Sequence, residues 1–260
     1  MSPPPASWTG PVSDSGVGAG RVVIVSGGSR GLGLGIGQKL AADGYRVVAI
    51  ARRNTDEFVA AAQDAASGEL HFRPFDLVDI AAIGGLISSV RREFGTIYGL
   101  INNAALGTSG VLGILPDRSI ERLVTLNTVS PMVLTKYAVR SMMAAGAGRI
   151  VNMASVVATT GFSGLSAYAA TKASMIGFTR SLAREVGRLG ITVNAIAPGF
   201  IDTEMTEAMQ DEQRQQVIRR SALRRLAEIE DVAGTVAFLL GPGGRNITGT
   251  VMTVDAGGTA

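Results

Sequence analysis

The chain has 260 residues, a formal net charge of +3, no cysteine and a single histidine, His71. Without cysteine it has no disulfides or thiolate metal sites, and one histidine argues against a His-rich metal centre and a Ser-His-Asp hydrolase. The basic residues are spread out with few aromatics between them, which argues against nucleic-acid binding. No apolar run approaches the length of a membrane span. We therefore expect a cytoplasmic protein with no bound metal, nucleic acid or membrane.

Residues 1–20 are rich in proline, serine and glycine and lack the charged and apolar regions of a secretory signal. We expect them to form a disordered tail. From residue 21 to 260, strand and helix patterns alternate without a linker, which predicts a single domain. Strands are expected near 21–26, 46–50, 70–75, 97–102, 149–154, 191–196 and 249–254, and helices near 31–43, 55–66, 79–94, 117–144, 166–189, 205–219 and 229–240. This alternation predicts an α/β fold, a doubly wound parallel sheet of about seven strands with helices on both faces.

A glycine-rich turn, S-G-G-S-R-G-L-G at 26–33, follows the first expected strand and precedes a helical pattern. Glycines at 27, 31 and 33 allow a tight turn, and the helix that follows offers unpaired N–H groups to a phosphate. The turn could be a plain strand-to-helix connection, but the strand before it and the helix after it favour a dinucleotide site. The spacing is G-x-x-x-G-x-G rather than G-x-G-x-x-G.

Charge after the second expected strand indicates which dinucleotide would bind. Arg52 and Arg53 follow that strand, and no carboxylate appears until Asp56. An acidic residue there would hold a ribose 2′-OH and repel a 2′-phosphate. Together with Arg30 in the glycine turn, these guanidinium groups suit a phosphate, although they could also be solvated at the start of a loop. The pattern favours NADP(H).

The stretch Ser155–Lys172 carries the strongest catalytic pattern. Tyr168 and Lys172 would lie one turn apart on a helix. A cation there lowers the pKa of a phenol, which could then exchange a proton near neutral pH. The pair could also be a packed tyrosine beside a solvated lysine. Asparagines end the fourth expected strand in Gly99–Ala105, where they could brace the strands or meet a ligand.

Together these motifs resemble the short-chain dehydrogenase/reductase family over about residues 20 to 257. The glycine turn matches, with Ser26 in the place of a threonine, and so does Asn102–Ala105, with Ala105 in the place of the usual glycine. Pro198–Thr203 matches the segment that borders the nicotinamide. Residues 181–206 and 246–258 are most similar to 3-oxoacyl-acyl-carrier-protein reductases.

The resemblance implies a Rossmann-type fold and a four-residue catalytic group. Tyr168 would give its proton to the alkoxide formed when NADPH delivers a hydride, and Ser155 would donate a hydrogen bond to the same oxygen. Lys172 would lower the Tyr168 pKa and bind the nicotinamide ribose, and Asn127 would hold a water that links Lys172 to solvent. Asn127 could equally be an oddity inside a helix, where asparagine is a poor residue. The cofactor-binding residues that the resemblance implies are Gly27, Ser29, Arg30, Leu32, Gly33, Arg52, Arg53, Asp76, Leu77, Asn103, Ala104, Tyr168, Lys172, Pro198, Gly199, Ile201 and Thr203.

The substrate is less well defined by the sequence. Residues 203–226 follow the nicotinamide-bordering segment, and we expect them to cover the pocket as a lid. Apolar side chains in this segment could line an acyl channel or simply pack its helix; they are Met205, Met209, Val217 and Leu223. Arginines in the same segment could face an acidic carrier protein or a CoA phosphate, or lie on a solvated helix face; they are Arg219, Arg220, Arg224 and Arg225.

One departure from the reductase pattern affects carrier docking. Reductases of acyl-carrier thioesters often have a basic residue in the turn after the long fourth helix, but here residues 144–147 read A-A-G-A. Arg149 and Arg188 could compensate.

The leading hypothesis is NADPH-dependent reduction of a 3-oxoacyl thioester, carried by acyl carrier protein or CoA, to the 3-hydroxyacyl form. A reductase of a free ketone, sugar or polyketide is the alternative, and a cofactor-binding regulatory protein without turnover is a third. The helix expected over Ala167–Leu189 and the stretch Thr248–Ala260 suit two-fold interfaces, which predicts a homotetramer.

Overall fold

The computed structural model describes residues 18, 20–64, 69–107, 110–201 and 211–260. Its seven strands form one parallel sheet in the order β3-β2-β1-β4-β5-β6-β7. The strands are β1 Val22–Ser26, β2 Arg46–Ala51, β3 Leu70–Pro74, β4 Ile97–Asn102, β5 Gly148–Met153, β6 Ile191–Pro198 and β7 Val251–Val254. The predicted Rossmann-type fold is confirmed, because the strand order reverses direction between β1 and β4 as in doubly wound sheets.

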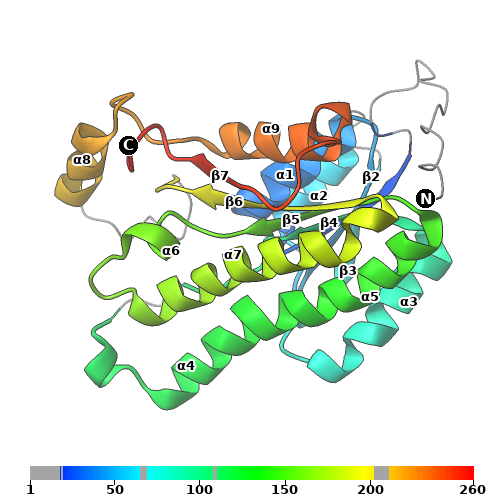
Figure 1. The fold of residues 1–260 in the computed structure, drawn as a ribbon, viewed down its shortest axis with the longest axis horizontal. Helices are drawn as coiled ribbons and strands as arrows, with labels where there is room; N and C mark the ends of the chain where they lie inside the picture. The colour runs from blue at the N-terminus through cyan, green and yellow to red at the C-terminus, as the bar shows by residue number, and fades with distance from the viewer. Residues whose placement is uncertain (1–17, 19, 65–68, 108–109, 202–210) are drawn as a thin grey trace, which may run out of the picture.

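Helices cover both faces of this sheet (Figure 1). One face carries α1 Gly31–Ala42, α2 Asp56–Gln63 and α9 Ile229–Leu240, and the other carries α3 Ile83–Phe94, α5 Ser130–Ala145 and α7 Ser166–Val186. Side chains along β1 alternate between the two layers: Val23 and Val25 pack with α1, whereas Val22 and Ile24 pack with α3. The inner strands are therefore largely apolar, because they are buried on both sides, whereas the edge strands β3 and β7 are only partly buried.

The helix expected over 117–144 is confirmed in its bounds, but it contains a π-helical turn that was not predicted. Helix α4 Asp117–Val124 runs into a π-helical turn, η4 Thr125–Val129, before α5 begins. Pro131 has no N–H for the carbonyl of residue 127, and its ring crowds that carbonyl. The Ser130 hydroxyl donates to the Thr125 carbonyl at 2.8 Å and supports the wider turn. Widened turns of this kind are frequent at functional sites.

The other elements differ little from the prediction. Helix α3 is preceded by a 3₁₀ turn, η2 Ile80–Ala82, and α7 is followed by another, η5 Gly187–Leu189. Helix α8 is described over Asp211–Arg220, and the rest of its expected range lies outside the described residues. Three short elements were not expected from the sequence: η3 Leu112–Ile114, α6 Val157–Thr160 and η6 Pro242–Gly244.

The predicted tail lies outside the described residues except for Gly18 and Gly20. The N–H groups of these two glycines donate to the carbonyls of Asp43 and Gly44, at 2.8 and 2.9 Å. Figure 1 shows α6 and α8 on the side of the molecule toward which β6 and β7 run. The carboxyl ends of the strands, where such sheets bind their ligands, lie on that side.

Candidate active site

The glycine turn lies at the carboxyl end of β1, beside β4, where the strand order reverses. Gly27 has a positive φ of 67° and its N–H donates to the Ile50 carbonyl at 2.7 Å. A Cβ on Gly33 would lie 2.1 Å from the Gly27 oxygen. Both positions therefore require glycine, and the turn keeps its backbone close to the first turn of α1, where a phosphate can approach N–H groups.

Asn103 fixes this turn. Its Nδ2 donates to the carbonyls of Ser26 at 3.0 Å and Gly27 at 3.2 Å. In return, the Ser26 hydroxyl accepts from the N–H groups of Asn103 at 2.9 Å and Ala104 at 3.0 Å. Of the two roles open from the sequence, bracing is therefore observed for this side chain. A role for Asn103 and Ala104 toward a cofactor stays a prediction.

Asn102, the residue before Asn103, is buried at the carboxyl end of β4. Its Nδ2 donates to Thr135 Oγ1 at 2.9 Å and to Asn152 Oδ1 at 2.8 Å. Asn152 Nδ2 in turn donates to Thr179 Oγ1 at 2.9 Å. This network joins β4 and β5 to α5 and α7, and it holds the strand ends that carry the proposed catalytic segment in a fixed register.

The predicted phosphate-binding arginines follow neighbouring strands. Arg30 precedes α1 after β1, Arg52 and Arg53 follow β2, and all three are exposed. Within the described ranges, neither Arg52 nor Arg53 has an ion-pair partner. The two loops are joined directly, because Thr55 Oγ1 donates to the Ser29 carbonyl at 2.5 Å. Three cationic side chains therefore lie on loops at one edge of the glycine turn.

Asp76 and Leu77 follow β3, the edge strand next to β2. Asp76 is exposed and its Oδ1 accepts from the Val78 N–H at 3.2 Å. Leu77 is buried, and its carbonyl accepts from the Ser130 hydroxyl at 2.6 Å. Leu32 on α1 is half-buried against the core. The predicted adenine-side residues therefore follow three adjacent strands, β1, β2 and β3.

Lys172 is buried in α7 and reaches the end of β5. Its Nζ donates to the Met153 carbonyl at 2.8 Å, and only 5% of the residue is exposed. Burial lowers the pKa of its ammonium group to about 8. The alternative of a solvated lysine is thereby excluded.

Tyr168 lies one turn before Lys172, with the Lys172 Nζ 5.6 Å from the centre of its ring. The sequence predicted a lowered pKa for this phenol, but burial raises its pKa to about 12. Desolvation outweighs the attraction of the ammonium, which hydrogen-bonds to Met153. Tyr168 is therefore fully protonated at neutral pH, as a proton donor has to be.

Asn127 lies in the π-helical turn and is buried. Its Oδ1 accepts from the Leu106 N–H at 2.8 Å, and its Nδ2 donates to the Leu106 carbonyl at 2.9 Å and to Thr171 Oγ1 at 3.2 Å. Thr171 adjoins Lys172, and its hydroxyl donates to the Tyr168 carbonyl at 2.7 Å. Asn127 thus ties the loop after β4 to the turn of α7 that carries Tyr168 and Lys172, and its water-holding role stays a prediction.

Ser155 lies two residues beyond β5 and is half-buried. Its Oγ accepts from the Val157 N–H at 3.4 Å, a weak contact that leaves the hydroxyl free to donate. The next N–H, that of Val156, donates to the Pro198 carbonyl at 3.0 Å. The loop after β5 is therefore held against the end of β6, where the predicted nicotinamide-bordering segment begins.

That segment packs against the end of β7. The Gly199 N–H donates to the Val254 carbonyl at 2.9 Å, and a Cβ on Gly199 would lie 2.6 Å from the Cβ of Asp255. Ile201 is buried and forms a β-bridge with Ala227. Thr203 and most of the expected lid's first half, including Met205 and Met209, lie outside the described residues.

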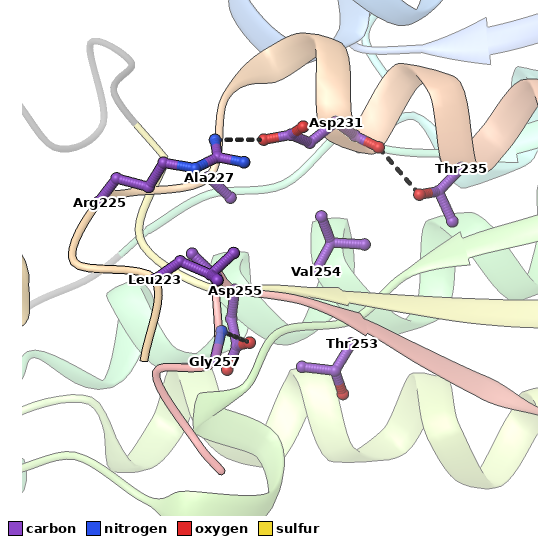
Figure 2. A pocket seen from close by; sticks show the side chains of 10 residues that line it. Leu223, Arg225, Ala227, Asp231, Thr235, Thr253, Val254, Asp255 and Gly257 are labelled. Carbon is purple, nitrogen blue, oxygen red and sulfur yellow. Dashed lines mark hydrogen bonds and ion pairs between the residues drawn. The ribbon is translucent and has the colours of Figure 1, made fainter. Parts of the chain in front are cut away.

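A pocket of about 330 Å³ lies between the start of α9 and the end of β7 (Figure 2). It is lined by Leu223, Arg225, Ala227, Asp231, Thr235, Thr253, Val254, Asp255, Ala256 and Gly257. None of these residues belongs to the predicted catalytic or cofactor-binding set. The pocket therefore borders the site rather than forming it.

Several residues that position the site were not found from the sequence. Thr171, Leu106 and Met153 hold Asn127 and Lys172, and Thr55 joins the two phosphate-side loops. Three of these contacts use backbone atoms, of Leu106, Met153 and Ser29, and backbone atoms leave no trace in residue type. In the part of the chain that the structure describes, no group of His, Asp and Glu residues could hold a metal ion. The same ranges contain no helix that is both long and apolar enough to span a bilayer.

The fold and this arrangement at the strand ends are those of a dinucleotide-dependent oxidoreductase. The chain belongs to the short-chain dehydrogenase/reductase family, whose members use a nicotinamide cofactor. A family model described as "Enoyl-(Acyl carrier protein) reductase" matches residues 27–259.

Individual relatives agree with this assignment. The chain is 37% identical over 238 residues to the 3-oxoacyl-[acyl-carrier-protein] reductase FabG of Escherichia coli, covering 92% of this chain and 97% of that protein. It is 36% identical over 239 residues to FabG of Pseudomonas aeruginosa, with the same coverage. A solved structure of a mutant short-chain dehydrogenase/reductase of Serratia marcescens superposes with a TM-score of 0.86 at 32% identity, covering 94% of this chain and all of that one.

Proposed function

We propose that the chain reduces a 3-oxoacyl thioester to the 3-hydroxyacyl thioester with NADPH. The observation that carries this proposal is the pairing of half-buried Tyr168 with buried Lys172, whose ammonium is held at the end of β5. It is supported by 36–37% identity to 3-oxoacyl-[acyl-carrier-protein] reductases over nearly the whole chain.

The residues present fit NADP(H). The glycine turn provides a cradle that a Cβ at Gly27 or Gly33 would fill, since that atom would lie within 3 Å of backbone atoms. Arg30, Arg52 and Arg53 would hold the 2′-phosphate by charge-assisted hydrogen bonds. Asp76 and Leu77 would border the adenine, and Pro198, Gly199 and Ile201 the nicotinamide. The bound cofactor supplies the hydride that adds to the carbonyl carbon.

The chain's own residues supply the proton and stabilise the developing charge. As the C=O π bond breaks, Tyr168 transfers its hydroxyl proton to the carbonyl oxygen, and Ser155 donates a hydrogen bond to the same oxygen. The phenolate left on Tyr168 lies beside the ammonium of Lys172, which stabilises it. Asn127 holds the backbone around Leu106 and Thr171 in place while this charge forms.

The protonated Tyr168 phenol favours reduction over oxidation at neutral pH. Because burial raises the Tyr168 pKa to about 12, the phenol carries the proton that reduction consumes. Alcohol oxidation requires the phenolate, which this environment disfavours. We therefore infer that reduction is the faster direction near pH 7.

The thioester would be carried by acyl carrier protein or CoA. Arg149, one of the residues expected to dock an acidic carrier, is engaged within the chain itself. Arg149 Nη1 donates to the Gly148 carbonyl at 2.8 Å, and its guanidinium lies 5.6 Å from the centre of the Tyr98 ring. In the expected lid, Arg224 donates to the Arg219 carbonyl and caps α8. Arg188, Arg219 and Arg220 are exposed and are the better candidates for an acidic carrier.

A substrate panel tests the proposal. The purified protein is mixed with NADPH and acetoacetyl-CoA, the matching acyl-carrier thioester, or free ketones and sugars, and absorbance is followed at 340 nm. We expect turnover of the thioesters at least tenfold above that of the free ketones in kcat/KM. Turnover confined to free ketones or sugars would overturn the proposal, and no turnover of any kind would favour a regulatory role.

A further inference from the structure

The described residues expose large apolar side chains unevenly. Five of these side chains are more than half exposed: Ile114 (81%), Val111 (67%), Leu223 (60%), Phe162 (55%) and Leu112 (54%). All five follow the carboxyl ends of strands on the catalytic side of the sheet. Apolar side chains that gather in this way mark a binding surface more often than chance exposure does.

Four of the five belong to two loops that are tied together. The Gly110 N–H, just before Val111, donates to the Gly164 carbonyl at 3.0 Å. Gly164 lies two residues after Phe162 and four before Tyr168. The loop after β4 is therefore fixed to the segment that connects Ser155 to Tyr168. Leu223 lies apart, in the pocket of Figure 2.

A third loop joins the same surface through an aromatic pair. The rings of Phe162 and Phe200 meet edge to face, with centroids 5.9 Å apart. Phe200 directly follows Pro198 and Gly199, which are predicted to border the nicotinamide. The loops after β4, β5 and β6 thus present apolar side chains next to the proposed catalytic group, and β5 pairs with both of the other strands.

We propose that Val111, Leu112, Ile114 and Phe162, with Phe200 behind Phe162, form a platform for the aliphatic chain of the substrate. This inference rests on the proposed function and adds that the enzyme prefers medium-length acyl chains to acetoacetyl. Neither loop offers a charged side chain over 110–114 or 161–165. Apolar contacts and an uncharged surface suit methylene groups and disfavour a sugar or other polyol.

The expected gain follows from partial burial. A fully buried methylene is worth roughly fourfold in an equilibrium or rate ratio, and a platform that covers one side of the chain gives about twofold per methylene. Four added methylenes, from the four-carbon to the eight-carbon thioester, should therefore raise kcat/KM by about tenfold or more.

The test is a chain-length series on one carrier. Rates with NADPH are measured for 3-oxoacyl-CoA esters of four, six and eight carbons, for the unmodified enzyme and for Phe162→Ala and Ile114→Ala. Val59→Ala is the control, because Val59 is an exposed apolar residue on α2, which packs with the other half of the sheet. We expect the eight-to-four-carbon ratio of kcat/KM to fall at least threefold in Phe162→Ala and Ile114→Ala and to stay unchanged in Val59→Ala.

Each outcome bears on one proposal. Equal kcat/KM at all chain lengths in the unmodified enzyme would overturn the platform while leaving thioester reduction intact. If Phe162→Ala lowers kcat/KM equally at every chain length, Phe162 only supports its loop. That result would also overturn the proposed platform. Failure to reduce any of the thioesters would instead count against the proposed function.

Discussion

The ammonium of Lys172 lies 5.6 Å from the centre of the Tyr168 ring, with Lys172 buried and Tyr168 half-buried. Burial moves their pKa values apart, raising that of the phenol to about 12 and lowering that of the ammonium to about 8. Each shift favours the neutral form of its group. At neutral pH the Tyr168 phenol is therefore uncharged and still holds the proton that it would donate.

Replacing Tyr168 by phenylalanine should remove the proton donor and keep the ring. We expect kcat to fall by roughly 10²–10⁴, the usual contribution of general acid–base catalysis, while the NADPH dissociation constant, measured by fluorescence titration, changes less than threefold. Tyr137→Phe is the matched control, since it removes a phenol hydroxyl on α5 and should leave kcat unchanged. A Tyr168→Phe enzyme that retains full turnover would exclude the mechanism.

The buried Lys172 should make folding stability depend on pH. Its pKa is lowered to about 8 in the folded chain from 10.5, so below pH 8 the buried charge costs stability in full. That cost disappears as pH rises from about 8 to 10.5, where the unfolded chain still binds the proton. Between pH 7 and 9.5, the unmodified protein should gain about 2 kcal/mol of unfolding free energy relative to Lys172→Met.

Urea denaturation of both proteins at pH 7 and pH 9.5 measures this difference. Tyr168 acts in the opposite sense, because its raised pKa costs stability only as pH rises above 10, so the chosen window avoids it. A relative stability that stays constant, or that falls with pH, would show that Lys172 is not desolvated in the folded state.

Much of the fold follows from the sequence, since a strand buried on both faces must be a continuous apolar run. All seven strands begin and end within two residues of the expected positions. The π-helical turn at Thr125–Val129 was not predicted, although Pro131 stands in the printed sequence, because the flanking residues keep a helical pattern. Asn127 was singled out as unfavourable inside a helix, and the π-helical turn explains why it is tolerated there.

The spacing of the candidate site residues predicted which of them lie together, but not the energetics of their surroundings. Tyr168 and Lys172 share a helix face, as their spacing indicates. The sign of the Tyr168 pKa shift depends on burial, which the spacing does not report. The partners of Lys172 and Asn127 are likewise atoms of Met153 and Leu106, brought near by the sheet. Spacing within one helix therefore predicts neighbours, whereas desolvation is a property of the assembled fold.

Arg52 should decide the choice between cofactors. A charge-assisted contact to the 2′-phosphate is worth about 1.5–3 kcal/mol, so the unmodified enzyme should prefer NADPH over NADH by about tenfold or more in kcat/KM. Arg52→Asp should erase or reverse this preference. Arg92→Asp makes the same change of charge on an exposed face of α3 and should leave it intact. Equal use of both cofactors by the unmodified enzyme would refute the assignment.

The chain should assemble as a homotetramer. Helices α5 and α7 and the segments joined to them carry partly exposed apolar side chains, including Val129, Met143 and Leu189. A two-fold axis would bury such a face against its own copy. Light scattering on the full chain and on a variant that lacks residues 1–18 should give the same mass, four times that of one chain. A monomer at micromolar concentration would contradict this, and loss of the tetramer on trimming would give the tail a role in assembly.

Gly33 should be intolerant of any side chain, because the backbone of the glycine turn passes directly over it. A Cβ there would lie 2.1 Å from the Gly27 oxygen and 2.6 Å from Asn103 Nδ2. Gly33→Ala must therefore push the turn away from α1 and break the bonds by which Asn103 holds it. We expect a loss of about 1–3 kcal/mol in unfolding free energy and at least tenfold weaker NADPH binding by fluorescence titration.

Gly85→Ala is the control for this substitution. Gly85 is also helical, and a Cβ there would meet nothing within 4 Å. The change should stabilise the protein by up to about 1 kcal/mol. If Gly33→Ala binds NADPH as tightly as the unmodified protein, the turn is not the dinucleotide cradle.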